Sequence, residues 1–161
     1  MDTPFDPITD SLDPQMYIVT MAVAEERSGC LVGFGSQCSI DPSRFIVWMS
    51  ELNHTYALAK TCEFAAVHLP RVDSVAIARH FGSETGDEVD KFADVAWHPG
   101  PNGSPVIAGL TWFEGRVLDR VDGGDHLGLL LAPEHGGVVS REVPVLRLRD
   151  VGDVEPGHPA D

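Results

Sequence analysis

The chain has 161 residues, 43% of them hydrophobic, which is enough to bury the core of a single domain. Its 25 acidic residues outnumber 11 Lys and Arg, so the formal net charge is −14 at pH 7. Nucleic-acid binding depends on basic side chains that neutralise phosphates, so we expect no nucleic-acid partner. Because the sequence shows no run of about 18 apolar residues and no basic leader, we expect a cytoplasmic protein without a membrane span.

Cysteine and histidine spacing gives no sign of a metal. The three cysteines, Cys30, Cys38 and Cys62, are odd in number and lack the paired spacing of a zinc site. The seven histidines show no two-ligand helical spacing. We therefore expect neither a disulfide framework nor a metal site, as suits a reducing compartment.

The first third of the chain predicts an arm followed by strands. Residues 1–15 carry three prolines and four aspartates, which indicates an extended arm or a short helical turn. Residues 17–24 and 29–38 are rich in strand formers around a polar turn, which predicts a hairpin. Residues 45–50 form the next strand, apolar enough to be buried on both faces.

The remainder alternates further strands with short helices. We expect strands at 63–69, 106–118 with a break near Gly109, 125–132 and 143–148, helices at 55–62, 75–81 and 86–92, and a loop at 97–105. Asp73 and Gly82 bound the 75–81 helix. Strands with only short helices between them favour a barrel over alternating βαβ units. The domain then covers 16–150, followed by a polar tail at 151–161.

The stretch from Ser28 to Thr55 is the first candidate site. It combines small residues in a strand with a cluster of hydroxyl and amide groups, namely Gly29, Gly33, Gly35, Ser36, Gln37, Ser39, Asn53 and Thr55. Glycine in a strand marks the close approach of a ligand, or else a bulge or barrel corner. Both interpretations stay open, and a flat ligand that bears a phosphate suits the first.

Two short motifs are further candidates. Gly124-Asp125-His126 precedes a strand and either aims side chains into a cleft or serves as turn chemistry. Asn53-His54-Thr55 begins a helix, where backbone N–H groups bind anions, although an ordinary N-cap is the better interpretation of these residues alone. Gly33-Phe34-Gly35 lacks the third glycine of a dinucleotide fingerprint, and Ser36 lacks the glycines of a nucleophile elbow.

The order of these segments resembles a known family. The series SGCLVGFGSQCSIDP, NHT, FAAVHL, IARHFGSETGDEVDKF, GSPVI and GDHLGLLL is similar to the flavin reductase-like family of FMN-binding split barrels, over roughly residues 16–150. The resemblance implies a mainly β fold, a six-stranded Greek-key split β-barrel with short helices in the connections. It also implies a homodimer with flavin near the subunit interface.

The resemblance assigns roles to matching positions. It implies flavin ring and ribityl contacts from the strand and turn that contain Gly33, Ser36, Gln37, Cys38 and Ser39, and phosphate contacts from Asn53, His54 and Thr55. Further cofactor contacts are implied for Lys91, Phe92, Gly124 and Asp125, with His126 near the flavin and the nicotinamide. The family often has an Asn where this chain has His68.

The implied activity is hydride transfer from NAD(P)H to FMN, with FAD as the other flavin, and delivery of reduced flavin to a partner such as a monooxygenase. Two alternatives remain open. One is a flavoprotein that holds FMN tightly and exchanges electrons with a partner. The other is a non-catalytic binder of flavin or of another planar cofactor such as haem or a deazaflavin. The small number of hydroxyl side chains near Gly33 leaves this alternative open.

Overall fold

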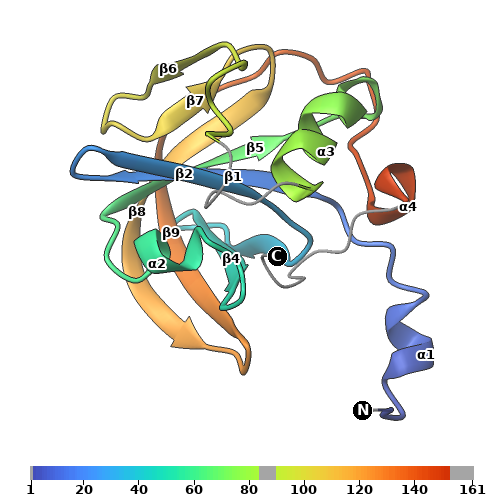
Figure 1. Ribbon diagram of the computed structural model, residues 1–161. Coiled ribbons are helices and arrows are strands. Elements are labelled where there is room, and N and C mark those ends of the chain that lie inside the picture. The colour runs from blue at the N-terminus through green and yellow to red at the C-terminus, as the bar shows by residue number, and fades with distance from the viewer. Residues whose placement is uncertain (1, 84–89, 153–161) are drawn as a thin grey trace.

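The computed structural model describes residues 2–83 and 90–152 (Figure 1). Its strands are β1 Tyr17–Val23, β2 Glu26–Val32, β3 Gly35–Ser39, β4 Arg44–Ser50, β5 Phe64–Leu69, β6 Trp97–Pro99, β7 Pro105–Ile107, β8 Thr111–Asp122 and β9 His126–Gly137. Its helices are short: α1 Asp6–Thr9, α2 Tyr56–Ala59, the 3-10 turn η1 Val72–Ser74, α3 Val75–Ser83 and α4 Leu148–Val151.

Seven strands form one antiparallel sheet in the order β2-β1-β5-β8-β9-β4-β3, and β6 and β7 pair separately. The mainly β prediction with short helices is confirmed. The six-stranded Greek-key barrel is not confirmed: the main sheet has seven strands, since the expected return strand at 29–38 is interrupted at Gly33 and Phe34. Its first half, β2, pairs with β1, and its second half, β3, pairs with β4, so the two ends of the sheet follow one another in the chain.

Strand β1 is buried on both faces because two cores flank it. Tyr17, Val19 and Met21 pack in one core with side chains of β4, β5 and β9. Ile18 packs in a second core with Phe81 of α3, which covers the other face. Alternating side chains therefore serve different cores. Figure 1 shows α3 lying across the β1–β2 layer, and α1 standing away from the body.

One buried polar side chain, that of His68, ties three strands together. His68 donates from Nδ1 to the Ile18 carbonyl at 2.9 Å, and its Nε2 accepts from the Ile107 N–H at 2.9 Å. Burial lowers the pKa of His68 to about 4, so the ring is neutral. The position where the family often has Asn is thus a structural link between β1, β5 and β7.

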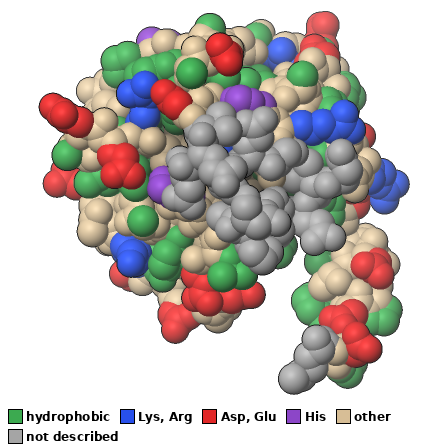
Figure 2. All heavy atoms as spheres, viewed as in Figure 1, with side chains coloured by type: hydrophobic (Ala, Val, Ile, Leu, Met, Phe, Trp, Pro, Cys, Tyr) green, Lys and Arg blue, Asp and Glu red, His purple; other side chains and the backbone are tan. Residues whose placement is uncertain are grey.

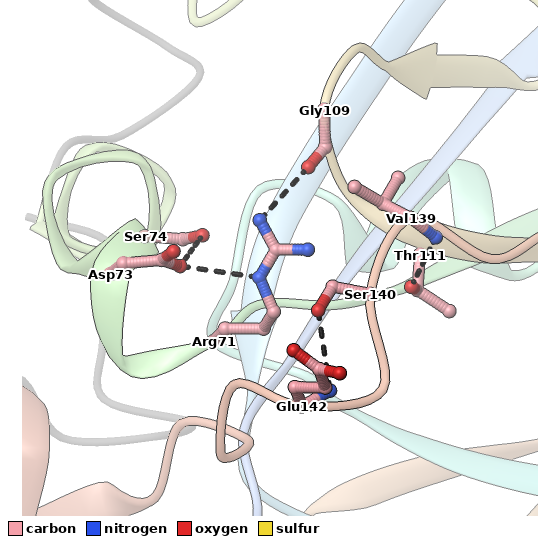
Figure 3. Close-up of polar contacts among 8 residues, drawn as sticks. All are labelled: Arg71, Asp73, Ser74, Gly109, Thr111, Val139, Ser140 and Glu142. Atoms are coloured by element: carbon pink, nitrogen blue, oxygen red, sulfur yellow. Dashed lines mark hydrogen bonds and ion pairs between the residues drawn. The ribbon is translucent and has the colours of Figure 1, made fainter.

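The expected strand at 143–148 is wrong. This segment makes isolated bridges, Val145 with Arg71 and Arg147 with Gln15, and then enters α4. A longer ladder is blocked because Pro70 and Pro144 have no N–H to donate. Arg71 sits at this junction, with Nε on Asp73 at 3.2 Å and Nη2 on the Gly109 carbonyl at 3.4 Å (Figure 3).

Other boundaries differ in detail. The expected loop at 97–105 contains the β6–β7 hairpin, because the buried Glu114 carboxylate accepts the backbone N–H groups of Asn102 and Ser104 and fixes the turn. α3 continues through Gly82. Residues 86–89 of the expected 86–92 helix lie outside the described residues, and those from Asp90 to Phe92 are not helical.

Candidate functional site

The aromatic residue at the strand interruption meets the histidine of the second motif. The rings of Phe34 and His126 have centroids 4.8 Å apart and planes inclined at 44°. Phe34 is 46% exposed, and its carbonyl accepts from the Trp48 N–H at 3.0 Å. Sequence reasoning considered Phe34 only within the rejected fingerprint. An aromatic residue between two glycines was the available signal.

The 124–126 turn contains both turn chemistry and an oriented imidazole. Asp122 accepts the Gly124 N–H at 2.9 Å, and Gly124 has φ of 111°, a left-handed conformation that glycine adopts without strain. Asp125 does not cap the turn; its Oδ1 lies 2.6 Å from His126 Nδ1. The carboxylate thus fixes the ring orientation, as carboxylates do for functional histidines.

The Asn53–Thr55 loop is ordered from within. Asn53 Oδ1 accepts the Thr55 N–H at 2.9 Å, and the buried Thr55 hydroxyl lies 2.7 Å from Ser28 Oγ. His54 Nε2 lies 3.9 Å from Glu26 Oε2. Because Asn53 uses its oxygen for this turn, its Nδ2 amide is the group with which it can donate to a ligand. The Thr55 hydroxyl is committed to β2.

Backbone contacts join these two motifs. The Glu51 N–H donates to the Asp125 carbonyl at 3.0 Å, and Ser50 is the register partner of His126. The loop that begins at Glu51 and the β8–β9 hairpin therefore share one end of the sheet. Sequence reasoning named both motifs, and the antiparallel β4–β9 pairing is what brings them together.

Strand β3 offers a separate polar surface. Ser36, Gln37 and Cys38 are exposed, and a hollow of about 600 Å³ lies over Gln37 to Asp41. As the last strand of the sheet, β3 has one edge whose N–H and C=O groups no strand of the described residues pairs. Such an edge matches the alternating donors and acceptors on the pyrimidine side of an isoalloxazine. The hollow is shallow and open, so the exposed polar groups of this edge, and not an enclosed cavity, are what suit a flavin.

Two of the strand glycines have packing reasons. A Cβ on Gly29 would lie 3.0 Å from both Phe81 Cε1 and Thr20 Cγ2, and one on Gly35 would lie 3.2 Å from Tyr17 Cε2. Both positions therefore need glycine so that neighbouring rings can approach. The ligand interpretation is not required for Gly29 and Gly35. Gly33 is buried at the strand break.

Lys91 and Phe92 lie under β2, apart from the Phe34–His126 contact. Lys91 Nζ donates to the carbonyls of Phe81 at 2.9 Å and Gly29 at 3.4 Å, while Phe92 packs in the second core. The nearby Cys30 thiol is buried, which raises its pKa to about 11 and leaves it protonated. Lys91 and Phe92 therefore hold α3 against β2 through their contacts with Phe81.

The described residues contain no group of three or more His, Cys, Asp or Glu that could hold a metal ion. In the same part of the chain, no helix has the length and apolar character needed to cross a membrane. Figure 2 shows acidic side chains at several separate places on the face of the molecule in view.

Comparison with known proteins places these features in a family context. The family model for the flavin reductase like domain matches residues 11–150. The chain is 28% identical over 127 residues to diflavin flavoprotein A 6 of Nostoc, covering 78% of this chain and 22% of that protein. It is 28% identical over 123 residues to HsaB, the reductase subunit of a flavin-dependent monooxygenase of Mycobacterium tuberculosis, covering 73% of this chain and 62% of that protein.

A solved structure shares the fold. The NADH:FAD oxidoreductase of Streptomyces globisporus matches with a TM-score of 0.78 at 20% identity, covering 90% of this chain and 89% of its own. At this identity the likeness is one of fold. The chain spans less than two-thirds of the length of both sequence relatives.

Proposed function

Because the chain belongs to the flavin reductase-like family, we propose that it is a flavin reductase that uses NAD(P)H to reduce FMN. In the balanced reaction, NAD(P)H gives a hydride and solvent gives a proton, so that oxidised flavin becomes the dihydroflavin and NAD(P)⁺ leaves. The flavin supplies the redox chemistry, and the protein supplies binding and orientation. The single observation that carries the proposal is the contact of Phe34 with His126, beside a loop that can hold a phosphate.

In this proposal the flavin ring lies along the β3 edge. Ser36, Gln37, Cys38 and Ser39 contribute their exposed side chains or edge backbone groups. Gly33, buried at the strand break, is assigned a backbone role that shapes this edge. The support is the unpaired edge of β3 and the hollow next to it. FMN is the first flavin to test, and FAD the second.

We assign the phosphate to the loop that begins at Asn53. The Asn53 amide and His54 are its direct contacts, and Thr55 acts through Ser28 and Asn53 by fixing the loop. Lys91 and Phe92 contribute from beneath β2, where they hold α3 in place. Gly124 and Asp125 shape the turn that presents His126.

His126 orients the nicotinamide. Asp125 holds Nδ1, so Nε2 is the nitrogen that can meet the carboxamide of the dinucleotide. The Phe34 ring packs against the His126 imidazole. Hydride transfer requires close approach and exclusion of water rather than a strong acid or base, and one histidine and an aromatic face meet that need.

We also propose a homodimer and a monooxygenase partner. The relationship to HsaB, named as a monooxygenase reductase subunit, supports the partner. Support for the dimer comes from the N-terminal arm, where Phe5, Ile8 and Leu12 are each more than half exposed. Light scattering of the purified chain measures the dimer, and a Phe5→Ser change in the arm weakens it if the arm contributes.

A steady-state assay tests the activity. Oxidation of NADH and of NADPH is followed with and without added FMN, after measuring how much flavin co-purifies. Turnover that rises with added FMN and saturates supports a reductase that releases its product. Flavin that co-purifies without turnover contradicts the proposal and favours the tightly bound electron carrier. FMN binding without any oxidation of dinucleotide favours a non-catalytic binder.

A further inference from the structure

Arg120 of β8 connects the strand that leads to the His126 turn with α2, the helix that follows the Asn53–Thr55 loop. Its Nε donates to the Ala59 carbonyl at 2.9 Å, and its Nη2 donates to the Cys62 carbonyl. These carbonyls lie at and just beyond the end of α2, a helix of one turn. Last-turn carbonyls have no partner within the helix, and a guanidinium both satisfies them and complements their partial negative charge. Figure 1 shows α2 beside β8.

A β-bulge directs Arg120 toward α2. Phe113 and Val117 face the first core, and regular alternation would place Asp119 on the same face. The β8–β9 register shifts between Val117 and Asp119, with Leu118 as the extra residue. Arg120 therefore takes the inward face in place of Asp119. Re-aiming a side chain in this way is a known consequence of a bulge.

The Asn53–Thr55 loop and α2 are thus held at both ends. At the start, Thr55 pairs with Ser28 of β2. At the end of α2, Arg120 attaches the helix to β8. Arg120 lies two residues before Asp122, where β8 ends and the turn to His126 begins. The Glu51 contact to the Asp125 carbonyl closes the connection on the other side of the loop. Arg120 is the one side chain on the β8 strand that bonds directly to the carbonyls at this end of α2 within the described structure.

We propose that Arg120 is a positioning residue, which sets the place of the Asn53–His54 loop relative to the His126 hairpin and thereby determines affinity for the flavin phosphate. The inference rests on the proposed function, because it takes this loop as the phosphate contact. Arg120 itself does not touch the flavin. Its loss removes the guanidinium from both carbonyls and frees the end of α2, which moves the loop away from the phosphate.

The test compares FMN with riboflavin, which lacks the phosphate. Fluorescence titrations give both dissociation constants for the wild type, Arg120→Gln, Arg120→Lys and Arg116→Gln, and thermal melts report folding. Arg116 is a matched control because it lies on the same strand but contacts Phe64 and Glu134 instead of α2. For Arg120→Gln we expect FMN affinity to fall by about tenfold, the equivalent of one hydrogen bond to a charged group, with riboflavin affinity unchanged.

Arg120→Lys keeps the charge and reaches one carbonyl, so it restores part of the preference for FMN. Arg116→Gln keeps the full preference. An unchanged FMN-to-riboflavin ratio in a folded Arg120→Gln overturns the inference, and so does an equal loss of both ligands. If Arg120→Gln does not fold, the same ratio in Arg120→Lys decides. A wild-type protein that binds no FMN refutes the proposed function instead, so the two failures are distinguishable.

Discussion

The rings of Phe34 and His126 are in contact, with centroids 4.8 Å apart, although Phe34 lies at the break between β2 and β3 and His126 begins β9. The contact exists because β4 pairs with both β3 and β9 and so brings the strand break beside the β8–β9 turn. An imidazole held by Asp125 on one nitrogen and packed against an aromatic ring has a fixed orientation. The proposed hydride transfer depends on that orientation.

Removing the Phe34 ring lowers turnover with little effect on stability. Phe34→Ala deletes a tilted ring contact worth about 0.5–1.5 kcal/mol, so we expect kcat/KM for the dinucleotide to fall by roughly two- to tenfold. The melting temperature stays close to that of the wild type because the ring is 46% exposed. Val138→Ala, which removes a 59% exposed side chain just beyond the end of β9 opposite to His126, is the control. Equal effects of both changes would contradict a specific role for Phe34.

His126→Ala separates catalysis from flavin binding. The change removes the group proposed to orient the nicotinamide but touches neither β3 nor the Asn53 loop. Anaerobic stopped-flow mixing should therefore show slower flavin reduction, by on the order of a hundredfold for a lost positioning group, with FMN affinity largely intact. Asp125→Asn keeps the turn and should give a smaller decrease. Reduction at the wild-type rate in His126→Ala would remove this histidine from the mechanism.

Gly29→Ala distinguishes packing from ligand approach. The added methyl would lie 3.0 Å from the Phe81 ring, so we expect unfolding free energy to fall by about 1–3 kcal/mol in urea titrations. FMN affinity should not change. Combining Gly29→Ala with Phe81→Leu should cost less than the sum of the single changes, because the smaller side chain relieves the clash. Loss of FMN affinity without loss of stability would restore the ligand interpretation.

His68 makes stability depend on pH. Its pKa is lowered from 6.5 to about 4 in the fold, so the unfolded chain takes up a proton first as pH falls. The stabilisation of the neutral ring is complete above pH 6.5 and is lost as pH falls from there to about 4, amounting to ~3 kcal/mol. Urea unfolding across this range should show a smaller pH dependence in His68→Gln than in the wild type. Parallel pH profiles for the two proteins would show that His68 does not titrate in this way.

The sequence was sufficient for the strands whose pattern is local. Residues 17–24 and 45–50 are apolar runs rich in strand formers, and both are strands in the structure. The sequence pattern gave the wrong secondary structure where residues distant in the chain determine the backbone pairing. Pro144 has no N–H and lies next to Pro70, so an apolar segment becomes a strap instead of a strand. The loop at 97–105 pairs as a hairpin because Glu114, on another strand, caps its backbone.

In the candidate site, too, local motifs could be predicted from the sequence and long-range arrangement could not. Asn53-His54-Thr55 and Gly124-Asp125-His126 were readable as polar motifs at element ends. Their proximity depends on the β4–β9 register, which is a long-range property. The direction of Arg120 depends on a bulge, and a single inserted residue in a strand leaves no clear mark on sequence periodicity.

The most direct measurement is the visible absorption spectrum of the protein with FMN under anaerobic conditions, recorded before and after addition of NADH or NADPH. The account predicts bleaching of the flavin bands faster than in a protein-free control, and the nucleotide that acts faster is the preferred donor. Flavin that binds but stays oxidised with both nucleotides would contradict reductase activity.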